Sequence, residues 1–249
     1  MLRPNGERYT VYLKPKTPTD KPTMRYINDV AIMTIPTFNV PLNPVSGNLG
    51  DFRNFEQRFH TLMTEAQQHG SKRLILDVRS NGGGDPYTAY SLVCGLGVKM
   101  ARVDEDKKGV TTTITCDGAG KTLVEYSDEP NPKEPYGFDT ANPANWTGPV
   151  AVLTSRFTGS GAENLADVLQ STKRALIVGE PTAGALGTTI GSSQLVNQAT
   201  LYYSISTMRD LNGHKPGIRI IPDVLVPLEP EGFVAGRDLQ LEAAISKLR

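Results

Sequence analysis

A glycine-flanked serine between an apolar run and an amphipathic stretch constrains the fold of this chain more than any other feature. Residues 150–154 are apolar and partly β-branched, as in a buried strand, and residues 161–171 place apolar side chains at helical spacing. Gly159 and Gly161 flank Ser160 between these two segments. The glycines permit a tight turn, and the amide of Gly161 is left free at the start of the helix. Such a turn can present a nucleophilic hydroxyl, although it can equally be a helix cap without chemistry.

The order of the other segments predicts a layered α/β domain. Apolar runs predict strands near residues 26–36, 72–79, 149–154, 174–178, 188–192 and 201–207. Amphipathic stretches predict helices over residues 51–66, 87–96, 161–171 and 238–248. Residues 110–115 and 122–127 are expected to form a hairpin, and residues 128–147 a surface excursion. Strands that alternate with helices are typical of a sheet covered by helices.

Composition excludes several classes of function. The 26 Lys and Arg residues balance the 26 Asp and Glu residues, so no global field favours a nucleic-acid partner. No apolar run is long enough for a membrane span, and the first residues lack the apolar core of a signal peptide. We therefore expect neither nucleic-acid binding nor a membrane span.

Cysteine and histidine usage predicts no metal, cofactor or disulfide. Cys94 and Cys116 are expected to be two buried or half-buried thiols, and the three histidines form no pair at metal-ligand spacing. No glycine-rich dinucleotide motif opens a helix. The nucleophile elbow needs glycines two residues before and after its serine, and Thr158 and Ala162 stand there instead.

Three stretches occur in a recognisable order. They are Leu-Ile-Leu-Asp-Val-Arg-Ser-Asn-Gly-Gly-Gly at residues 74–84, Val-Leu-Thr-Ser-Arg-Phe-Thr-Gly-Ser-Gly-Ala-Glu at residues 152–163 continuing to Gly-Glu-Pro-Thr at 179–182, and Gly-Ile-Arg-Ile-Ile-Pro-Asp at 217–223. Together they resemble the core of the C-terminal processing (tail-specific) serine peptidases. That family also takes in the tricorn core and the retinoid-binding repeats of interphotoreceptor retinoid-binding protein.

The resemblance implies a fold and a domain organisation. It covers roughly residues 25–228 and implies a crotonase-like (ClpP/crotonase) α/β core, which we place at residues 25–249. A PDZ domain commonly precedes this core in the family. Residues 1–24 are therefore expected to be the last strand of a PDZ-like domain and a linker.

The resemblance also assigns roles to residues of this chain. Ser160 matches the nucleophile, and the amides of Gly161 and Gly84 match the oxyanion hole. Glu163 matches a glutamate that orients the general base in many members, although an acidic residue in a first helical turn is also favoured by the helix dipole.

One position departs from the family pattern. Ala185 stands where the Ser-Lys members carry the lysine that acts as general base, and alanine cannot accept the serine proton. In the tricorn-like branch the base is a histidine before the PDZ domain, which would lie outside this chain. His214 and Lys173 are candidate bases within it, and in the retinoid-binding branch the site has no catalytic role.

We therefore expect a serine endopeptidase core that hydrolyses peptide bonds in unfolded or C-terminal protein segments. The alternative is a catalytically inactive member of the same fold that binds apolar ligands or peptides. The resemblance implies a periplasmic, cell-envelope or secreted location, which no targeting signal in the chain supports.

Overall fold

A computed structural model describes most of the chain. The described residues are 21–39, 52–119, 121–127, 136–139, 146–186, 190–210, 212–213, 215–229, 232 and 234–248. The elements in chain order are β1 (Thr23–Ile27), β2 (Val30–Thr34), α1 (Phe52–Gln68), β3 (Arg73–Asp77), α2 (Pro86–Gly95), β4 (Lys99–Asp106), β5 (Thr111–Asp117), β6 (Lys121–Tyr126), β7 (Tyr136–Asp139), β8 (Val150–Thr154), α3 (Gly161–Ser171), β9 (Leu176–Gly179), β10 (Ile190–Gln194), β11 (Thr200–Ser204), β12 (Ser206–Asp210), β13 (Val224–Leu225) and α5 (Leu239–Lys247). The predicted PDZ strand and most of its linker lie outside the described residues.

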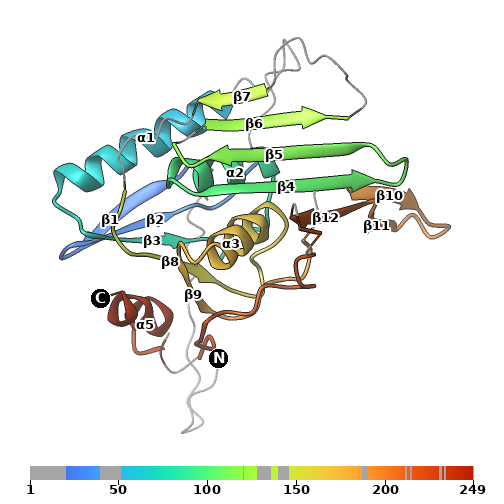
Figure 1. The fold of residues 1–249 in the computed structure, drawn as a ribbon. Helices are drawn as coiled ribbons and strands as arrows, with labels where there is room; N and C mark the ends of the chain where they lie inside the picture. The colour runs from blue at the N-terminus through green and yellow to red at the C-terminus, as the bar shows by residue number, and fades with distance from the viewer. Residues whose placement is uncertain are drawn as a thin grey trace, which may run out of the picture.

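The fold is layered, as the sequence predicted. A six-stranded sheet has the order β1-β2-β3-β8-β9-β13, and a five-stranded sheet has the order β12-β4-β5-β6-β7. Helices α1, α2 and α3 lie between the two sheets, and α5 covers the opposite face of the six-stranded sheet (Figure 1).

The parallel strands of the six-stranded sheet place two turns next to each other. Strands β2, β3, β8, β9 and β13 run parallel, and only β1 is antiparallel to its neighbour. Because β3 and β8 are hydrogen-bonded neighbours, their carboxyl ends meet at the same edge of the sheet. The glycine turn after β3 and the Ser160 turn after β8 are therefore adjacent, where open α/β sheets commonly bind ligands.

The central strands are buried on both faces, which explains their continuous apolar sequence. In β8, Val150 and Val152 pack into the core beneath α1, α2 and α3, whereas Ala151 and Leu153 face α5. Leu241 and Ala244 of α5 complete that second cluster. Alternate residues of one strand thus anchor helices on both sides and fix the edge that carries the turns.

The second sheet was only partly predicted from the sequence. The hairpin of β5 and β6 is confirmed, but β4 was missed because its Lys, Arg, Asp and Glu residues hide the strand pattern. Residues 136–139 form β7 against β6, so this part of the predicted surface excursion is an edge strand. The predicted strand at 201–207 is two strands, β11 and β12, which belong to different sheets. The predicted strand at 26–36 spans two strands: its first residues end β1, its centre forms β2, and the chain turns between them at Asn28 with a φ of 53°.

The two cysteines form a disulfide, which corrects the expectation of two thiols. Cys94 in α2 and Cys116 in β5 are both buried, and their Cα atoms are 5.3 Å apart. This bond could not be predicted from the sequence, because the two positions are 22 residues apart and lie in different elements, with β4 between them. The bond links α2, the helix that follows the glycine turn, to the five-stranded sheet.

Candidate active site

Ser160 has a backbone conformation that residues other than glycine rarely adopt. Its φ is 48° and its ψ is −118°, whereas an N-cap serine normally has an extended backbone with negative φ. Strained dihedrals persist where the surroundings hold them, and they cluster at functional sites. Two hydrogen bonds hold this turn: Gly159 N–H donates to the carbonyl of Asn81 at 3.0 Å, and Ser160 N–H donates to Glu163 Oε2 at 2.9 Å. Ser160 is therefore not an ordinary helix cap.

The glycine turn after β3 packs directly against Ser160. A Cβ added to Gly83 would lie 2.6 Å from the Cβ of Ser160, and one added to Gly84 would lie 2.3 Å from the backbone of Phe38. Both glycines also have positive φ, 113° and 130°. A larger residue at Gly83 would push the two turns apart, and one at Gly84 would clash with the backbone of residues 38–39, so both contacts require glycine.

Two backbone amides converge beside Ser160 without a partner. Within the described part of the chain, neither Gly84 N–H nor Gly161 N–H donates a hydrogen bond. The two groups are close, because a Cβ added to Gly161 would lie 3.6 Å from Gly84 N. Gly83 N–H, in contrast, is used by the side chain of Asn81 at 2.9 Å. A pair of free donors next to a serine is the arrangement that stabilises the oxyanion in acyl transfer.

The Glu163 carboxylate ties the Ser160 turn to residues 182–185. The side chain is fully buried. Its Oε2 accepts from Ser160 N–H at 2.9 Å and from Ala185 N–H at 2.8 Å, and its Oε1 accepts from Gly184 N–H at 2.8 Å and from the Thr182 hydroxyl at 2.5 Å. All four donors are neutral, so these contacts position the backbone around Ser160.

Ala185, where the resemblance implies a lysine in other members, is next to Ser160 in space. Ala185 N and Ser160 N donate to the same oxygen of Glu163, which places the two nitrogens no more than about 6 Å apart. Ala185 itself is exposed and offers no proton acceptor on its side chain.

The predicted bases within the chain are not brought to Ser160. Lys173 follows the carboxyl end of α3, about 16 Å along the helix from Ser160 at its amino end. His214 lies outside the described residues. His60, on α1, is half-buried, and burial lowers its pKa. Among the described residues, no lysine or histidine makes any of the contacts with the Ser160 turn given above.

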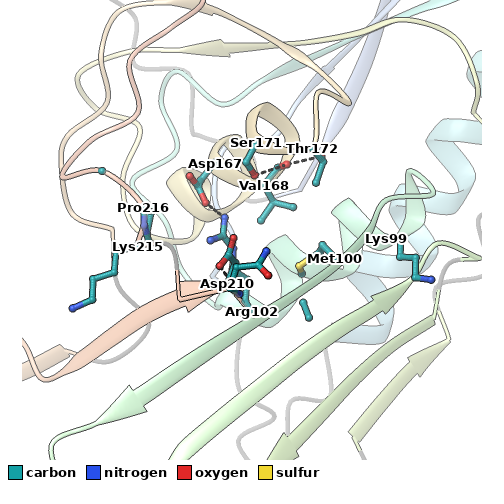
Figure 2. Close-up of a pocket in the computed structure, with 13 residues that line it drawn as sticks. Lys99, Met100, Arg102, Asp167, Val168, Ser171, Thr172, Asp210, Lys215 and Pro216 are labelled. Carbon is teal, nitrogen blue, oxygen red and sulfur yellow. Dashed lines mark hydrogen bonds and ion pairs between the residues drawn. The ribbon is translucent and has the colours of Figure 1, made fainter.

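A polar pocket of about 430 Å³ lies over the carboxyl half of α3. Figure 2 shows Arg102 of β4 paired with Asp167 of α3 at its centre, while the chains of Lys99 and Lys215 extend away from that pair. This pocket is one or more helical turns from Ser160. Lys215, a further lysine near the end of the core, is therefore placed at this pocket.

The described residues contain neither a cluster of metal ligands nor a membrane-spanning helix. No group of three His, Cys, Asp or Glu side chains there could hold a metal ion. No helix in that part of the chain combines the length and apolar character needed to cross a bilayer.

Two supporting residues were not singled out from the sequence. The Asn81 side chain accepts from Gly83 N–H and donates to the carbonyl of Ile35 at 3.1 Å, which shapes the glycine turn. The Thr182 hydroxyl connects Glu163 to Ile220 N–H at 2.8 Å. An asparagine directly before three glycines is a turn signal that could have pointed to Asn81.

Comparison with known proteins places the chain in a family. The sequence model of Peptidase family S41 matches residues 29–226. The chain is 32% identical over 185 residues to a chloroplastic C-terminal processing peptidase of Tetradesmus obliquus, covering 70% of this chain and 34% of the relative. It is 28% identical over 190 residues to the carboxyl-terminal-processing protease of a Picosynechococcus strain, covering 75% and 40%. The chain thus spans well under half the length of these relatives.

Solved structures share the fold. A lipoprotein from Streptococcus agalactiae aligns with a TM-score of 0.60 at 21% identity, covering 92% of this chain and 70% of that one. The photosystem II D1 C-terminal processing protease aligns with a TM-score of 0.52 at 24% identity, covering 88% and 46%. Because the family model matches most of the length of this chain, the chain belongs to Peptidase family S41.

Proposed function

We propose that the chain is the core of a serine endopeptidase in which Ser160 is the nucleophile. One observation carries the proposal: a serine in a strained strand-to-helix turn lies beside two backbone amides that have no partner among the described residues. A helix start alone leaves the amide of Gly161 free, but it explains neither the strained backbone of Ser160 nor the second free amide, that of Gly84, beside it.

The proposed reaction follows from these positions. The Oγ of Ser160 attacks the carbonyl carbon of a peptide bond, and the negative oxygen that forms accepts hydrogen bonds from Gly161 N–H and Gly84 N–H. A base takes the proton of Ser160 and returns it to the leaving amine, and water then hydrolyses the acyl-enzyme. Removing one such backbone donor typically costs about two to three powers of ten in rate.

The general base is proposed to come from outside this chain. Ala185 supplies no acceptor, Lys173 is too distant, and the relatives are more than twice as long as the matched segment. Glu163 then acts as a positioning residue that holds residues 182–185 against the Ser160 turn. By itself, the chain is expected to have very low peptidase activity.

The substrates are proposed to be unfolded or C-terminal segments of proteins, as the names of the C-terminal processing relatives suggest. We also propose that the protein is located outside the reducing cytosol. The Cys94–Cys116 disulfide supports it, because such bonds persist in oxidising compartments.

A second candidate function is a catalytically inactive binding core on the same fold. The observation that favours it is Ala185, which leaves Ser160 without a base inside the described residues. Such a core would bind peptides or apolar ligands without cleaving them.

Covalent labelling separates the two candidates. The full-length protein is treated with a fluorophosphonate probe beside a Ser160→Ala variant, and folding of both is checked by circular dichroism. The peptidase proposal predicts labelling that disappears in the variant. Equal labelling, or none, in a folded full-length protein would leave only the binding function.

A further inference from the structure

Three segments lie side by side around Ser160 and form a rim. Ala183 N–H donates to the carbonyl of Thr158 at 2.9 Å, which joins residues 182–185 to the Ser160 turn. Thr182 N–H donates to the carbonyl of Ile220 at 3.1 Å, which joins the same segment to residues 218–220. Side chains of residues 218 and 219 therefore stand beside the candidate active site.

Arg219 is a charged side chain on this rim. It is exposed, and its Nε lies 3.7 Å from the place where a Cβ on Gly184 would stand. Gly184 N and Ser160 N donate to the two oxygens of one Glu163 carboxylate, so they are no more than about 8 Å apart. One residue of an extended peptide spans about 3.3–3.6 Å. The guanidinium is thus at most about four residues along a bound peptide from Ser160.

The positive charge of Arg219 is not matched within the described residues, where it forms no ion pair or hydrogen bond. The Glu163 carboxylate, which holds Gly184 beside Arg219, already accepts from four neutral donors. An arginine without a carboxylate beside a peptide-binding site has its full set of donors available to a ligand.

The neighbours of Arg219 suit a peptide. Ile218 is 84% exposed and Phe157, three residues before Ser160, is 64% exposed. Exposed apolar side chains in the segment 218–220 and just before Ser160 offer contact area to a peptide, and the Arg219 guanidinium adds a point of charge recognition.

We propose that Arg219, flanked by Ile218, is a carboxylate-binding subsite that selects peptides for attack by Ser160. The planar guanidinium can bind both oxygens of a carboxylate at once, which a lysine cannot. The carboxylate is an Asp or Glu side chain or the free C-terminus of the peptide. This inference rests on the proposed function, because it assumes that a peptide lies across Ser160.

Peptide binding to the Ser160→Ala protein tests the subsite without cleavage or a base. Fluorescein-labelled decapeptides of alanine and leucine carry Glu, Gln or Lys at each position in turn with an amidated C-terminus, and a further set carries Gln with a free C-terminus. Binding is measured by fluorescence anisotropy at low and high salt. We expect one carboxylate source, Glu over Gln or free acid over amide, to bind about 3- to 10-fold more tightly, less so at high salt.

Two variants and a control make the test specific. Arg219→Gln should abolish the preference, and Arg219→Glu should reverse it in favour of the Lys peptides. Arg237→Gln is the matched control, because Arg237 is an exposed arginine that precedes α5 and pairs with Glu242 of that helix. A preference that survives in Arg219→Gln, or is absent from the parent protein, overturns the subsite. Absence of any peptide binding also overturns it, whereas Ser160 labelling in the full-length protein judges the proposed function separately.

Discussion

The buried carboxylate of Glu163 gives the sharpest prediction about how the site is held together. Glu163→Gln keeps the size of the side chain but replaces one acceptor oxygen with an amide that donates. Each oxygen of Glu163 serves two donors at 2.5–2.9 Å, so the variant leaves at least one backbone N–H facing another donor. Hydrogen bonds to a charged group contribute about 1.5–3 kcal/mol each, and a buried donor without an acceptor costs about 1–3 kcal/mol.

We therefore expect Glu163→Gln to lower the free energy of unfolding by about 3 kcal/mol. For a domain of this size that corresponds to a fall in Tm of roughly 6–12 °C. Thermal unfolding followed by circular dichroism measures it, with Glu242→Gln as control, because that carboxylate is exposed and should leave Tm unchanged. If the Glu163→Gln variant has the same Tm as the parent protein, Glu163 does not hold residues 182–185 in place. Its role would then be to orient a basic side chain.

The remaining predictions concern stability elsewhere in the fold. Asn164 is buried and its side-chain amide has no partner among the described residues, whereas the buried amide of Asn81 is hydrogen-bonded at both ends. Asn164→Leu should therefore leave Tm unchanged or raised, and Asn81→Leu should lower Tm by several degrees. Equal losses of Tm would show that Asn164 is hydrogen-bonded in solution. Replacing Cys94 and Cys116 by serine should lower the free energy of unfolding by about 3 kcal/mol, and treating the parent protein with a reductant should have the same effect. A reductant that leaves Tm unchanged would mean that the disulfide is absent. Burial acts to raise the pKa of Asp238, but hydrogen bonds from Arg79 and Leu241 N–H outweigh it and lower the pKa overall. A lowered carboxyl pKa stabilises the fold above the unfolded pKa of about 3.9 and loses that effect as the pH falls, so Asp238→Asn should lower Tm at pH 7 more than at pH 3, and an equal loss at both would contradict the ion pair.

Long apolar strands and marked turns could be predicted from the sequence because burial on both faces leaves a clear pattern. Residues 150–154 and 161–171 lie in the strand and helix expected there, and the adjacency of the two glycine turns follows from parallel pairing of β3 and β8. Strand β4 could not be predicted in this way. Two of its charged residues, Arg102 and Asp104, are buried. Arg102 pairs with Asp167 of α3, and such pairing depends on an element far away in the chain.

The candidate site was predictable where backbone geometry depends on glycine and unpredictable where it depends on distant partners. Gly84 and Gly161 could be singled out because no other residue permits such close approach. The positive φ of Ser160 could not, because Thr158 and Ala162 replace the glycines that usually mark such a turn. The four donors of Glu163 also escaped prediction, since three of them come from residues 182–185, about twenty positions further along.

The central claim is that the site around Ser160 is complete except for a base. Ala185→Lys tests it most directly, because Ala185 is exposed and its nitrogen shares a carboxylate oxygen with Ser160 N–H. The rate of fluorophosphonate labelling is measured in the parent chain, in Ala185→Lys and in the same variant combined with Ser160→Ala. The account predicts that Ala185→Lys labels at least tenfold faster than the parent, increasingly so as the pH rises, and that the double variant does not label. A folded Ala185→Lys protein that labels no faster than the parent would contradict it.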